Sequence, residues 1–403
     1  MGNALARLAS ASEKGAVIAL LGKVTADNAH ELGQALTELR RQHPQGPLTL
    51  DADELDYISS AGLRVIMRLL KSEGALSLVN ASRDVYDVFE MTGLTELIDV
   101  RRRLREVSLE GATMLGRGGN GEVWRLNPET VIKVYNEGTS LEKIDAENVQ
   151  ATAAFKAGVP CAIAFDTVRV GSRFGIVFEL LNAQTVGNTV HEDPSRIPEL
   201  GRSMGELLRE LHGTHMAPGV LPTIDDKMAP WIDYLESRYL SHEDAGLMRQ
   251  VAGAVPKKDT LLHLDFHEGN VMIQGSELIL IDLDDVCVGN PLYDLINHHS
   301  SHIMAAESAP AVIGASMGMN VEEALAMHRA TLKAYFGTND DAVIDGHVQR
   351  MRLLMLFSTI LFLAKSRDSK NMTPERVRDV LAQILPQFRA MHQQIVGVVS
   401  SYS

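Results

Sequence analysis

The sequence lacks most of the features that would assign it to a specialised class of protein. It contains only two cysteines, Cys161 and Cys287, which are too few for a disulfide framework and suit a reducing compartment. Basic residues are outnumbered, and the formal net charge is −14. Because an acidic chain repels the phosphate backbone of nucleic acids, we expect no nucleic-acid partner.

Long hydrophobic runs are also missing. The run from Ala16 to Leu21 is short, and no small-residue cleavage site of a signal peptide follows it. The longest run, Leu353 to Ala364, is interrupted by Ser358 and Thr359 and is shorter than the ~18 residues needed to span a bilayer. We therefore expect a cytoplasmic protein without membrane contact, in which this longest run forms a buried helix.

What is present is an apolar content of 45% in 403 residues, which is enough for sizeable cores in two or three domains. At the start of the chain, short apolar runs alternate with segments whose apolar residues recur at helical spacing. The expected elements are strands at 16–21, 48–52 and 75–79 and helices at 25–42, 63–70 and 84–97. This β-α-β-α-β-α order predicts an α/β sandwich.

Four arginines break the acidic trend directly after this pattern: Arg101, Arg102, Arg103 and Arg105. Such a cluster is more often a solvated linker than an anion-binding or docking patch. We expect a linker here, and a new domain that begins near Val107.

A glycine-rich turn lies between two expected strands of this next domain. It reads Gly116-Arg-Gly118-Gly119-Asn-Gly121-Glu-Val123 and continues as a strand. In a dinucleotide-binding fold the same glycine spacing would open a helix. A glycine loop between antiparallel strands can instead lie over nucleotide phosphates and offer them backbone N–H groups. The alternative interpretation is a plain hairpin turn.

Lys133 lies in the middle of the apolar strand Val131 to Tyr135. A lysine in that position is costly unless it has a partner, and a nucleotide phosphate together with a carboxylate would suit it. The following helix offers Glu142 and Glu147. We prefer Glu147, because it lies near the middle of the helix, although taken alone it would be a surface glutamate.

The strongest pattern is His263-Leu-Asp265-Phe-His267-Glu-Gly-Asn270. In a short loop after a strand, Asp265 would orient or deprotonate an attacking hydroxyl, and the amide oxygen of Asn270 would hold a metal. A second carboxylate, Asp282, ends a buried strand one hairpin later, so Asn270 and Asp282 can share Mg²⁺. The two histidines of the loop, without further ligands, do not predict a zinc site.

Together these motifs resemble the aminoglycoside phosphotransferase and choline kinase-like branch of the protein-kinase fold, over residues 107–390. That branch usually has His-Gly-Asp-Leu-His-x-x-Asn in its catalytic loop, so Leu264 replaces a glycine. The segment from Asp282 to Asp285 resembles its metal-binding segment, with Asp284 as a second contributor. In that branch the metal-binding segment is followed by the motif Gly-Asp-Pro-x-x-Asp-Leu. In this sequence Asn290 replaces the first aspartate of that motif, whereas Asp294 matches the second.

The resemblance implies an α+β bilobal domain, with an N-lobe at 106–182 and a largely helical C-lobe at 183–403. It implies ATP and Mg²⁺ as cofactors, and a hinge, Phe178-Glu179-Leu-Leu181, whose backbone groups hold adenine. The phosphate acceptor would be a hydroxyl of a small molecule or a protein serine, and the fold does not choose between them.

Residues 215–260 and 300–400 are expected to line the acceptor site. Four acidic residues in the first range would attract a cationic acceptor, although we favour a solvated helical face for them. They are Asp225, Asp226, Asp233 and Glu236.

Residues 1–105 resemble a STAS domain, the fold of anti-sigma-factor antagonists, through Leu55-Asp-Tyr-Ile-Ser59-Ser60-Ala-Gly-Leu63. In that family a partner kinase phosphorylates a serine at the start of this helix. Ser60 matches that serine, and Ser59 stands where many members have aspartate. The alternative is that Ser60 only caps the helix.

The leading hypothesis is an ATP-dependent phosphotransferase with a regulatory STAS module. The alternative is a signalling scaffold, in which the STAS domain binds an anti-sigma factor or another partner and the kinase-like domain senses nucleotide. A third hypothesis joins the two, with the kinase-like domain phosphorylating Ser60.

Overall fold

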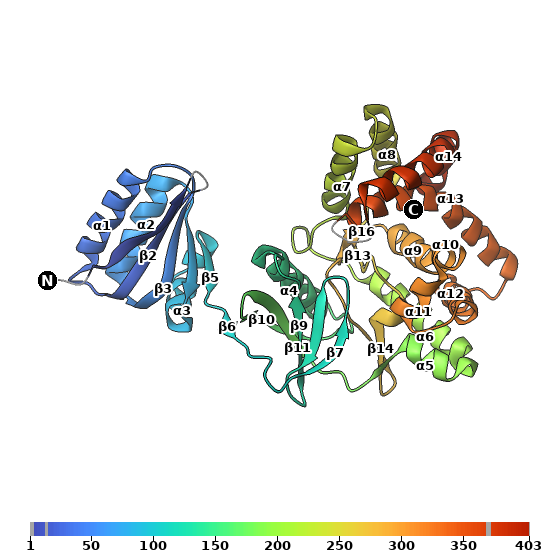
Figure 1. Cartoon of the computed structure of the whole chain (residues 1–403), viewed down its shortest axis with the longest axis horizontal. Coiled ribbons are helices and arrows are strands. Elements are labelled where there is room, and N and C mark those ends of the chain that lie inside the picture. Colours follow the sequence, from blue (N-terminus) through green and yellow to red (C-terminus); the bar gives the residue numbers. More distant parts are fainter. Residues whose placement is uncertain (1–3, 13–14, 368–371, 403) are drawn as a thin grey trace. The chain divides into compact units, whose positions relative to one another are not determined.

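The computed structural model describes residues 4–12, 15–367 and 372–402. The chain divides into two compact units, Met1–Glu106 and Val107–Ser403, whose elements are labelled in Figure 1. Each unit is described by itself below. The division of the second unit into lobes at residues 182 and 183 stays a prediction.

The first unit is built on one five-stranded sheet with the order β1-β2-β3-β4-β5. Strands β2 to β5 are parallel, and β1 pairs with β2 in the antiparallel sense. The strands are β1 (Ala6–Ser12), β2 (Gly15–Val24), β3 (Leu48–Ile58), β4 (Ser77–Ala81) and β5 (Asp99–Arg102), and the helices are α1 (Ala29–Gln42), α2 (Ser60–Glu73), α3 (Arg83–Met91) and the 3₁₀ turn η1 (Leu94–Glu96). The predicted α/β sandwich is confirmed.

The two outermost strands, β1 and β5, are the elements that the sequence pattern did not predict. Most of β1 is exposed, and β5 reads Asp-Val-Arg-Arg, so neither carries a run of buried apolar residues. An edge strand needs a partner on one side only, and its charged residues keep other chains from pairing there. Apolar periodicity therefore could not reveal them.

The expectation of an arginine-rich linker is wrong. Arg101 and Arg102 belong to β5, and the guanidinium group of Arg102 lies 4.0 Å from the ring centroid of Tyr86. Arg103 pairs with Asp53 at 2.8 Å, and Arg101 pairs with Asp99 at 2.9 Å. These cations are bound within the first unit, which also argues against a patch kept free for anions.

The second unit begins with an antiparallel sheet in the order β10-β11-β9-β8-β7. Its strands are β7 (Thr113–Arg117), β8 (Gly121–Arg125), β9 (Thr130–Tyr135), β10 (Ala164–Val170) and β11 (Arg173–Glu179); the two-residue β6 (Arg105–Glu106) precedes them, and α4 (Leu141–Lys156) follows β9. The glycine-rich turn joins β7 to β8 as a hairpin, as predicted.

From residue 184 onward the unit is mostly helical, with two small sheets ordered β12-β14-β15 and β13-β16. The strands are β12 (Gln184–Thr185), β13 (Thr260–Leu262), β14 (Val271–Gln274), β15 (Glu277–Leu280) and β16 (Cys287–Gly289). The helices are α5 (Val186–Glu192), α6 (Ile197–Gly213), α7 (Ile224–Arg238), α8 (His242–Ala254), α9 (Leu292–His299), α10 (Ala305–Ser308), α11 (Pro310–Met317), α12 (Val321–Phe336), α13 (Asp341–Lys365) and α14 (Pro374–Ser400), with 3₁₀ turns η2 (Pro194–Arg196) and η3 (Glu268–Asn270) and a π-helical turn η4 (Ser300–Met304). The expected kinase-like fold, with a helical C-terminal part, is confirmed.

The longest apolar run lies in α13. Among the described residues, this is the one helix long and apolar enough to cross a bilayer by length and composition, and 44% of its most apolar window is buried within the fold. Leu354, Phe357 and Ile360 are buried there in a core shared with α7, α9 and α14. The expected helix is present, and these side chains have apolar partners inside the protein.

Helices α6 and α12 approach each other closely because α6 carries glycines on the contact face. A Cβ atom at Gly201 would lie 2.3 Å from the Cβ of Ala330, and one at Gly205 would lie 2.4 Å from the carbonyl oxygen of Thr331. Gly213, at the end of the same helix, has nothing within 4 Å of its Cβ position. Close packing therefore constrains Gly205 and not Gly213.

Gly205→Ala is expected to destabilise the second unit by about 1–3 kcal/mol, because the added methyl group meets backbone atoms of α12. The matched control Gly213→Ala should be neutral or stabilising by up to ~1 kcal/mol, since alanine favours helix. Guanidinium unfolding can be followed by tryptophan fluorescence, because Trp124 and Trp231 both lie in this unit. Equal effects of the two substitutions would contradict the packing argument.

Candidate active site

The glycine-rich hairpin is closed by a hydrogen bond from the Gly118 amide to the Gly121 carbonyl at 2.9 Å. Gly121 is required by packing, because a Cβ there would lie 2.2 Å from the carbonyl oxygen of Val134. At Gly116, Gly118 and Gly119 a Cβ would meet nothing within 4 Å. Packing inside the protein does not explain these three glycines, whereas a ligand that approaches the bare backbone would.

Lys133 on β9 is bound by two carboxylates. Its Nζ lies 2.9 Å from Oε1 of Glu147 on α4 and 2.6 Å from Oδ1 of Asp282, which follows β15. Burial alone would lower the pKa of Lys133, but the two carboxylates outweigh it and raise the pKa. The structure thus brings three predicted site residues together, with Glu147 rather than Glu142 as the helix partner.

Three aspartates crowd the segment after β15, at positions 282, 284 and 285. Burial, followed by repulsion from Asp282 and Asp285, raises the pKa of Asp284 to about 8. Burial would also raise the pKa of Asp285, but Lys365 at 2.5 Å and Lys227 at 3.4 Å lower it. The ionised form of Asp284 is therefore disfavoured in the protein alone, and a divalent cation bound by Asp282 and Asp284 would favour it.

Asn120, in the glycine-rich turn, also reaches this acidic segment. Its Nδ2 donates to Oδ2 of Asp284 at 2.8 Å. The turn and the acidic segment are separated by more than 160 residues in the chain, and this bond brings them into direct contact.

The loop after β13 carries Asp265 and Asn270. The Asn270 amide nitrogen donates to the Asp265 carbonyl at 3.0 Å and to its carboxylate at 3.1 Å. With its nitrogen so engaged, Asn270 has its amide oxygen left to accept or to ligate. The Asp265 side chain is 47% exposed, so a dissolved molecule can reach it.

Asp294, which the sequence identified only as part of a motif, holds this loop in place. Its fully buried carboxylate accepts from the amides of His263 at 2.8 Å and Leu264 at 2.6 Å, and from Nε2 of His212 at 3.0 Å. Leu264 has φ of 60°, the left-handed region that suits the family's usual glycine and strains a leucine. The two bonds to Asp294 hold the backbone in this conformation.

Lys365 is a residue of the site that sequence reasoning missed. It ends α13, and its Nζ lies 2.5 Å from Asp285 and 3.3 Å from the carbonyl oxygen of Leu264. It therefore joins the acidic segment to the loop of Asp265. The only feature of the sequence that could have indicated Lys365 is its position at the end of a long apolar run. Its partner Asp285 lies 80 residues away in the chain, so no local motif connects the two residues.

The acidic residues considered for a cationic acceptor are paired within the fold. Asp225 pairs with Lys257, and Asp226 closes the capping box of α7. Arg249 binds both Asp233, at 2.7 Å, and Glu236, at 2.5 Å. These contacts favour the interpretation of a solvated helical face.

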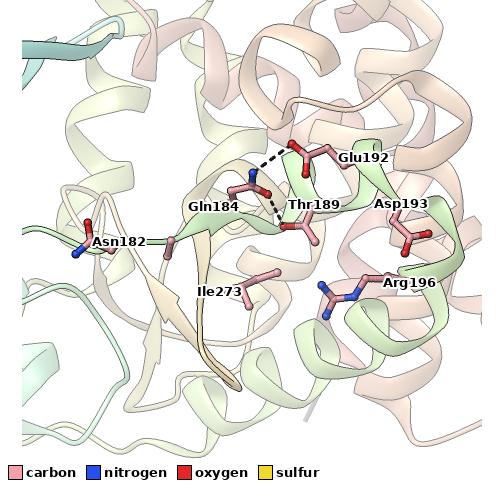
Figure 2. Close-up of a pocket in the computed structure, with 8 residues that line it drawn as sticks. Asn182, Gln184, Thr189, Glu192, Asp193, Arg196 and Ile273 are labelled. Carbon is pink, nitrogen blue, oxygen red and sulfur yellow. Dashed lines mark hydrogen bonds between the residues drawn. The ribbon is translucent and has the colours of Figure 1, made fainter.

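The predicted hinge leads into an open pocket of about 690 Å³. In the hinge, the Glu179 carboxylate accepts from the amide of Ile163 at 2.8 Å, and Leu181 is buried. Figure 2 shows the pocket, where Gln184 bonds to Glu192 at 3.2 Å. The lining residues are Asn182, Ala183, Gln184, Thr189, Glu192, Asp193, Arg196 and Ile273. None of the predicted catalytic residues is among them, so the pocket adjoins the constellation and does not contain it.

In the first unit, the cap of α2 is Ser59. Its hydroxyl accepts from the Gly62 amide at 3.4 Å, and Ser60 is the exposed first residue of the helix. The interpretation that Ser60 only caps the helix is therefore wrong, and its hydroxyl faces solvent.

Comparison with known proteins identifies the families that the two units resemble. Residues 112–324 match the family model described as phosphotransferase enzyme family, and residues 8–99 match the one described as Mlab, STAS domain. BtrV of Bordetella bronchiseptica, named as a candidate anti-sigma factor antagonist, is 36% identical over 107 residues, which are 25% of this chain and 90% of that protein.

Two examples represent the many solved structures that are similar to this chain. A choline/ethanolamine kinase family protein from Mesorhizobium loti is 18% identical, with 72% of this chain and 92% of that chain covered and a TM-score of 0.45. The gentamicin complex of APH(2'')-IIa is 16% identical, with 72% and 91% covered and a TM-score of 0.44.

Asp294→Ala is expected to destabilise the second unit by about 3–5 kcal/mol, because it leaves the buried amides of the loop and His212 without their acceptor. The matched control Asp226→Ala removes an exposed helix cap and should cost only ~1 kcal/mol. Guanidinium unfolding monitored by tryptophan fluorescence measures both. An Asp294→Ala cost no larger than that of Asp226→Ala would overturn the anchoring role.

Proposed function

The chain belongs to the phosphotransferase enzyme family and carries a STAS domain in its first unit, and we propose that it transfers the γ-phosphate of ATP to a hydroxyl acceptor with Mg²⁺. The observation that supports this best is the contact of Lys133 with both Glu147 and Asp282. It joins the sheet, helix α4 and the acidic segment around one buried cation, as a nucleotide phosphate site requires.

In the proposed nucleotide site, different segments of the protein bind the phosphates and the adenine. The backbone N–H groups around Gly118 and Gly119 cover the phosphates, and Lys133, held by Glu147, neutralises their charge. The hinge at Glu179 and Leu181 binds adenine through backbone groups, with Val123 above the base.

Asn270 and Asp282 are the proposed magnesium ligands, with Asp284 as a further contributor. When bound there, Mg²⁺ supplies positive charge that offsets the phosphates and the crowded aspartates. The raised pKa of Asp284 supports this assignment, because burial and the neighbouring Asp282 and Asp285 disfavour its ionised form, which a bound cation would stabilise.

Asp265 is the proposed catalytic base. The acceptor hydroxyl binds at its exposed carboxylate and gives up its proton to it as the acceptor oxygen bonds to the γ-phosphorus. The bond between the γ-phosphorus and the bridging oxygen breaks, and ADP leaves with that electron pair. Asn270 orients Asp265 through the two hydrogen bonds already described.

For the first unit we propose a signalling role. The STAS domain would bind an anti-sigma factor or another partner protein, with exposed Ser60 as the residue whose phosphorylation controls binding. A phosphate there adds about −1.5 to −2 charges. The N-terminus of α2 accommodates negative charge, so the docking surface would change while the fold persists.

Asp265→Asn is expected to reduce phosphate transfer by roughly 10²–10⁴-fold, because the acceptor loses its base. Nucleotide binding should stay within about twofold of the wild type, since Asp265 contacts the acceptor and not the nucleotide. ADP release with a panel of hydroxyl acceptors and calorimetric titration with ATP and Mg²⁺ measure the two effects. The control Asp233→Asn, on α7, should leave both unchanged.

If Asp265→Asn still transferred phosphate, the assignment of Asp265 as the catalytic base would be wrong. Nucleotide binding without any transfer by the wild type would favour the scaffold hypothesis. Intact-mass analysis with phosphosite mapping of the same reactions tests the third hypothesis, because phosphate on Ser60 in the wild type, absent from Asp265→Asn, would mean that the two units form a self-contained switch.

Ser60→Asp, which mimics the added charge, is expected to stabilise the first unit by about 0.3–1 kcal/mol through the dipole of α2. The matched control Lys71→Asp, in the last turn of the same helix, should destabilise it by a similar amount. Scanning calorimetry of the full chain measures both. A destabilising Ser60→Asp would argue against a switch at this position.

A further inference from the structure

A cluster of histidines lies buried directly behind the loop of Asp265. His298 and His299 end α9, His302 lies in the π-helical turn η4, and His328 comes from α12. All four are at most 3% exposed. Glu268, in the same loop as Asp265, is also fully buried and reaches into the cluster.

Three of these residues converge on one point. The ligand atoms of Glu268, His298 and His302 all lie within 4.8 Å of one another. The Nε2 atom of His302 is 2.8 Å from Oε2 of Glu268, and the ring centroids of His298 and His302 are 4.3 Å apart. A carboxylate and two imidazoles are thus gathered without contact with solvent.

Backbone carbonyls orient both histidines. Nδ1 of His298 lies 3.1 Å from the Phe266 carbonyl, and Nδ1 of His302 lies 2.7 Å from the His298 carbonyl. A carbonyl only accepts, so each Nδ1 carries a proton and donates it. Metal-binding histidines in proteins are oriented in the same way, with one ring nitrogen donating to a carbonyl and the other facing the ion.

Two of the converging atoms have no hydrogen-bond partner. These are Nε2 of His298 and Oε1 of Glu268, both completely buried within the described part of the chain. Buried polar atoms nearly always have a partner, and an unpaired one calls for an explanation. A cation between them would satisfy both atoms at once.

We propose that Glu268, His298 and His302 hold one divalent transition-metal ion, with zinc as the best match. Imidazole nitrogen together with carboxylate oxygen is a common zinc donor set, whereas Mg²⁺ prefers oxygen ligands alone. Zinc bonds of roughly 2.0–2.1 Å place tetrahedral ligand atoms about 3.4 Å apart. The ion therefore takes the place of the proton between His302 and Glu268, and His298 moves closer.

The site would stabilise the catalytic loop without taking part in phosphate transfer. Glu268 lies between Asp265 and Asn270, so the ion ties this loop to α9 and η4. The π-helical turn at Ser300–Met304 supports the idea, because such turns frequently occur at functional sites. The proposal does not depend on the proposed phosphotransferase activity.

The test is the metal content of the tag-free full chain, measured by plasma mass spectrometry after gel filtration. We expect roughly one zinc ion per chain, and tetrahedral cobalt absorption after exchange with Co²⁺. His298→Gln and His302→Gln should lose the metal. The matched control His299→Gln, equally buried but outside the ligand set, should keep it, and so should Asp282→Asn, which disables the proposed magnesium site.

Two results would overturn the site. The first is wild-type protein that carries no zinc and takes up neither Zn²⁺ nor Co²⁺ after reconstitution, which would make Glu268 and His302 a metal-free ion pair. The second is undiminished metal in folded His298→Gln and His302→Gln protein. The wild-type measurement is decisive even where a variant fails to fold. Chelation of the metal should also lower the thermal midpoint of the second unit.

Discussion

The burial of charge on Lys133 is the constraint around which the second unit is organised. A lysine inside an apolar strand needs anionic partners, and these come from α4 and from the segment after β15. Satisfying one cation therefore fixes the position of a helix and a loop relative to the sheet. The same arrangement leaves Asp284 with more negative charge around it than the protein offsets. The groups that compensate the charge of Lys133 are thus the same ones that we propose for the binding of the cation and the phosphates.

A second buried carboxylate, Asp294, fixes the loop of Asp265, as Glu147 fixes Lys133. It binds two consecutive amides of a loop whose Leu264 occupies a left-handed conformation. Strain of this kind persists only where the surroundings over-determine the backbone. Lys365 adds a cationic contact to the same loop, and the buried Glu268 reaches into the histidine cluster on its other side. Asp294, Lys365 and the histidine cluster therefore all hold the loop that carries Asp265, which suits the proposed role of Asp265 in positioning a hydroxyl group.

The two units differ in how they display their reactive groups. In the second unit Lys133 and Asn270 are mostly buried, whereas the side chain of Asp265 is 47% exposed. In the STAS domain, Ser60 stands exposed at the start of α2, because its neighbour Ser59 provides the cap. A serine that the fold does not need is free to be modified without loss of structure. The proposed function would connect phosphate chemistry to protein–protein signalling within one chain.

The sequence by itself determined the parts of this protein that depend on short spacings. These parts are the hairpin around Gly118, the strand around Lys133 and the five-residue spacing from Asp265 to Asn270. Each is formed by residues close together in the chain, so the sequence alone is enough to predict it. Only the tertiary structure decided which distant groups meet them. Lys365 reaches Asp285 from the end of α13, Asp294 binds the loop across 30 residues, and Glu268 meets His302 across 34. The arginine cluster became an edge strand because pairing with β4, not its own composition, gave it structure. Such contacts are selected by burial and charge compensation in three dimensions, and no periodicity along the chain records them.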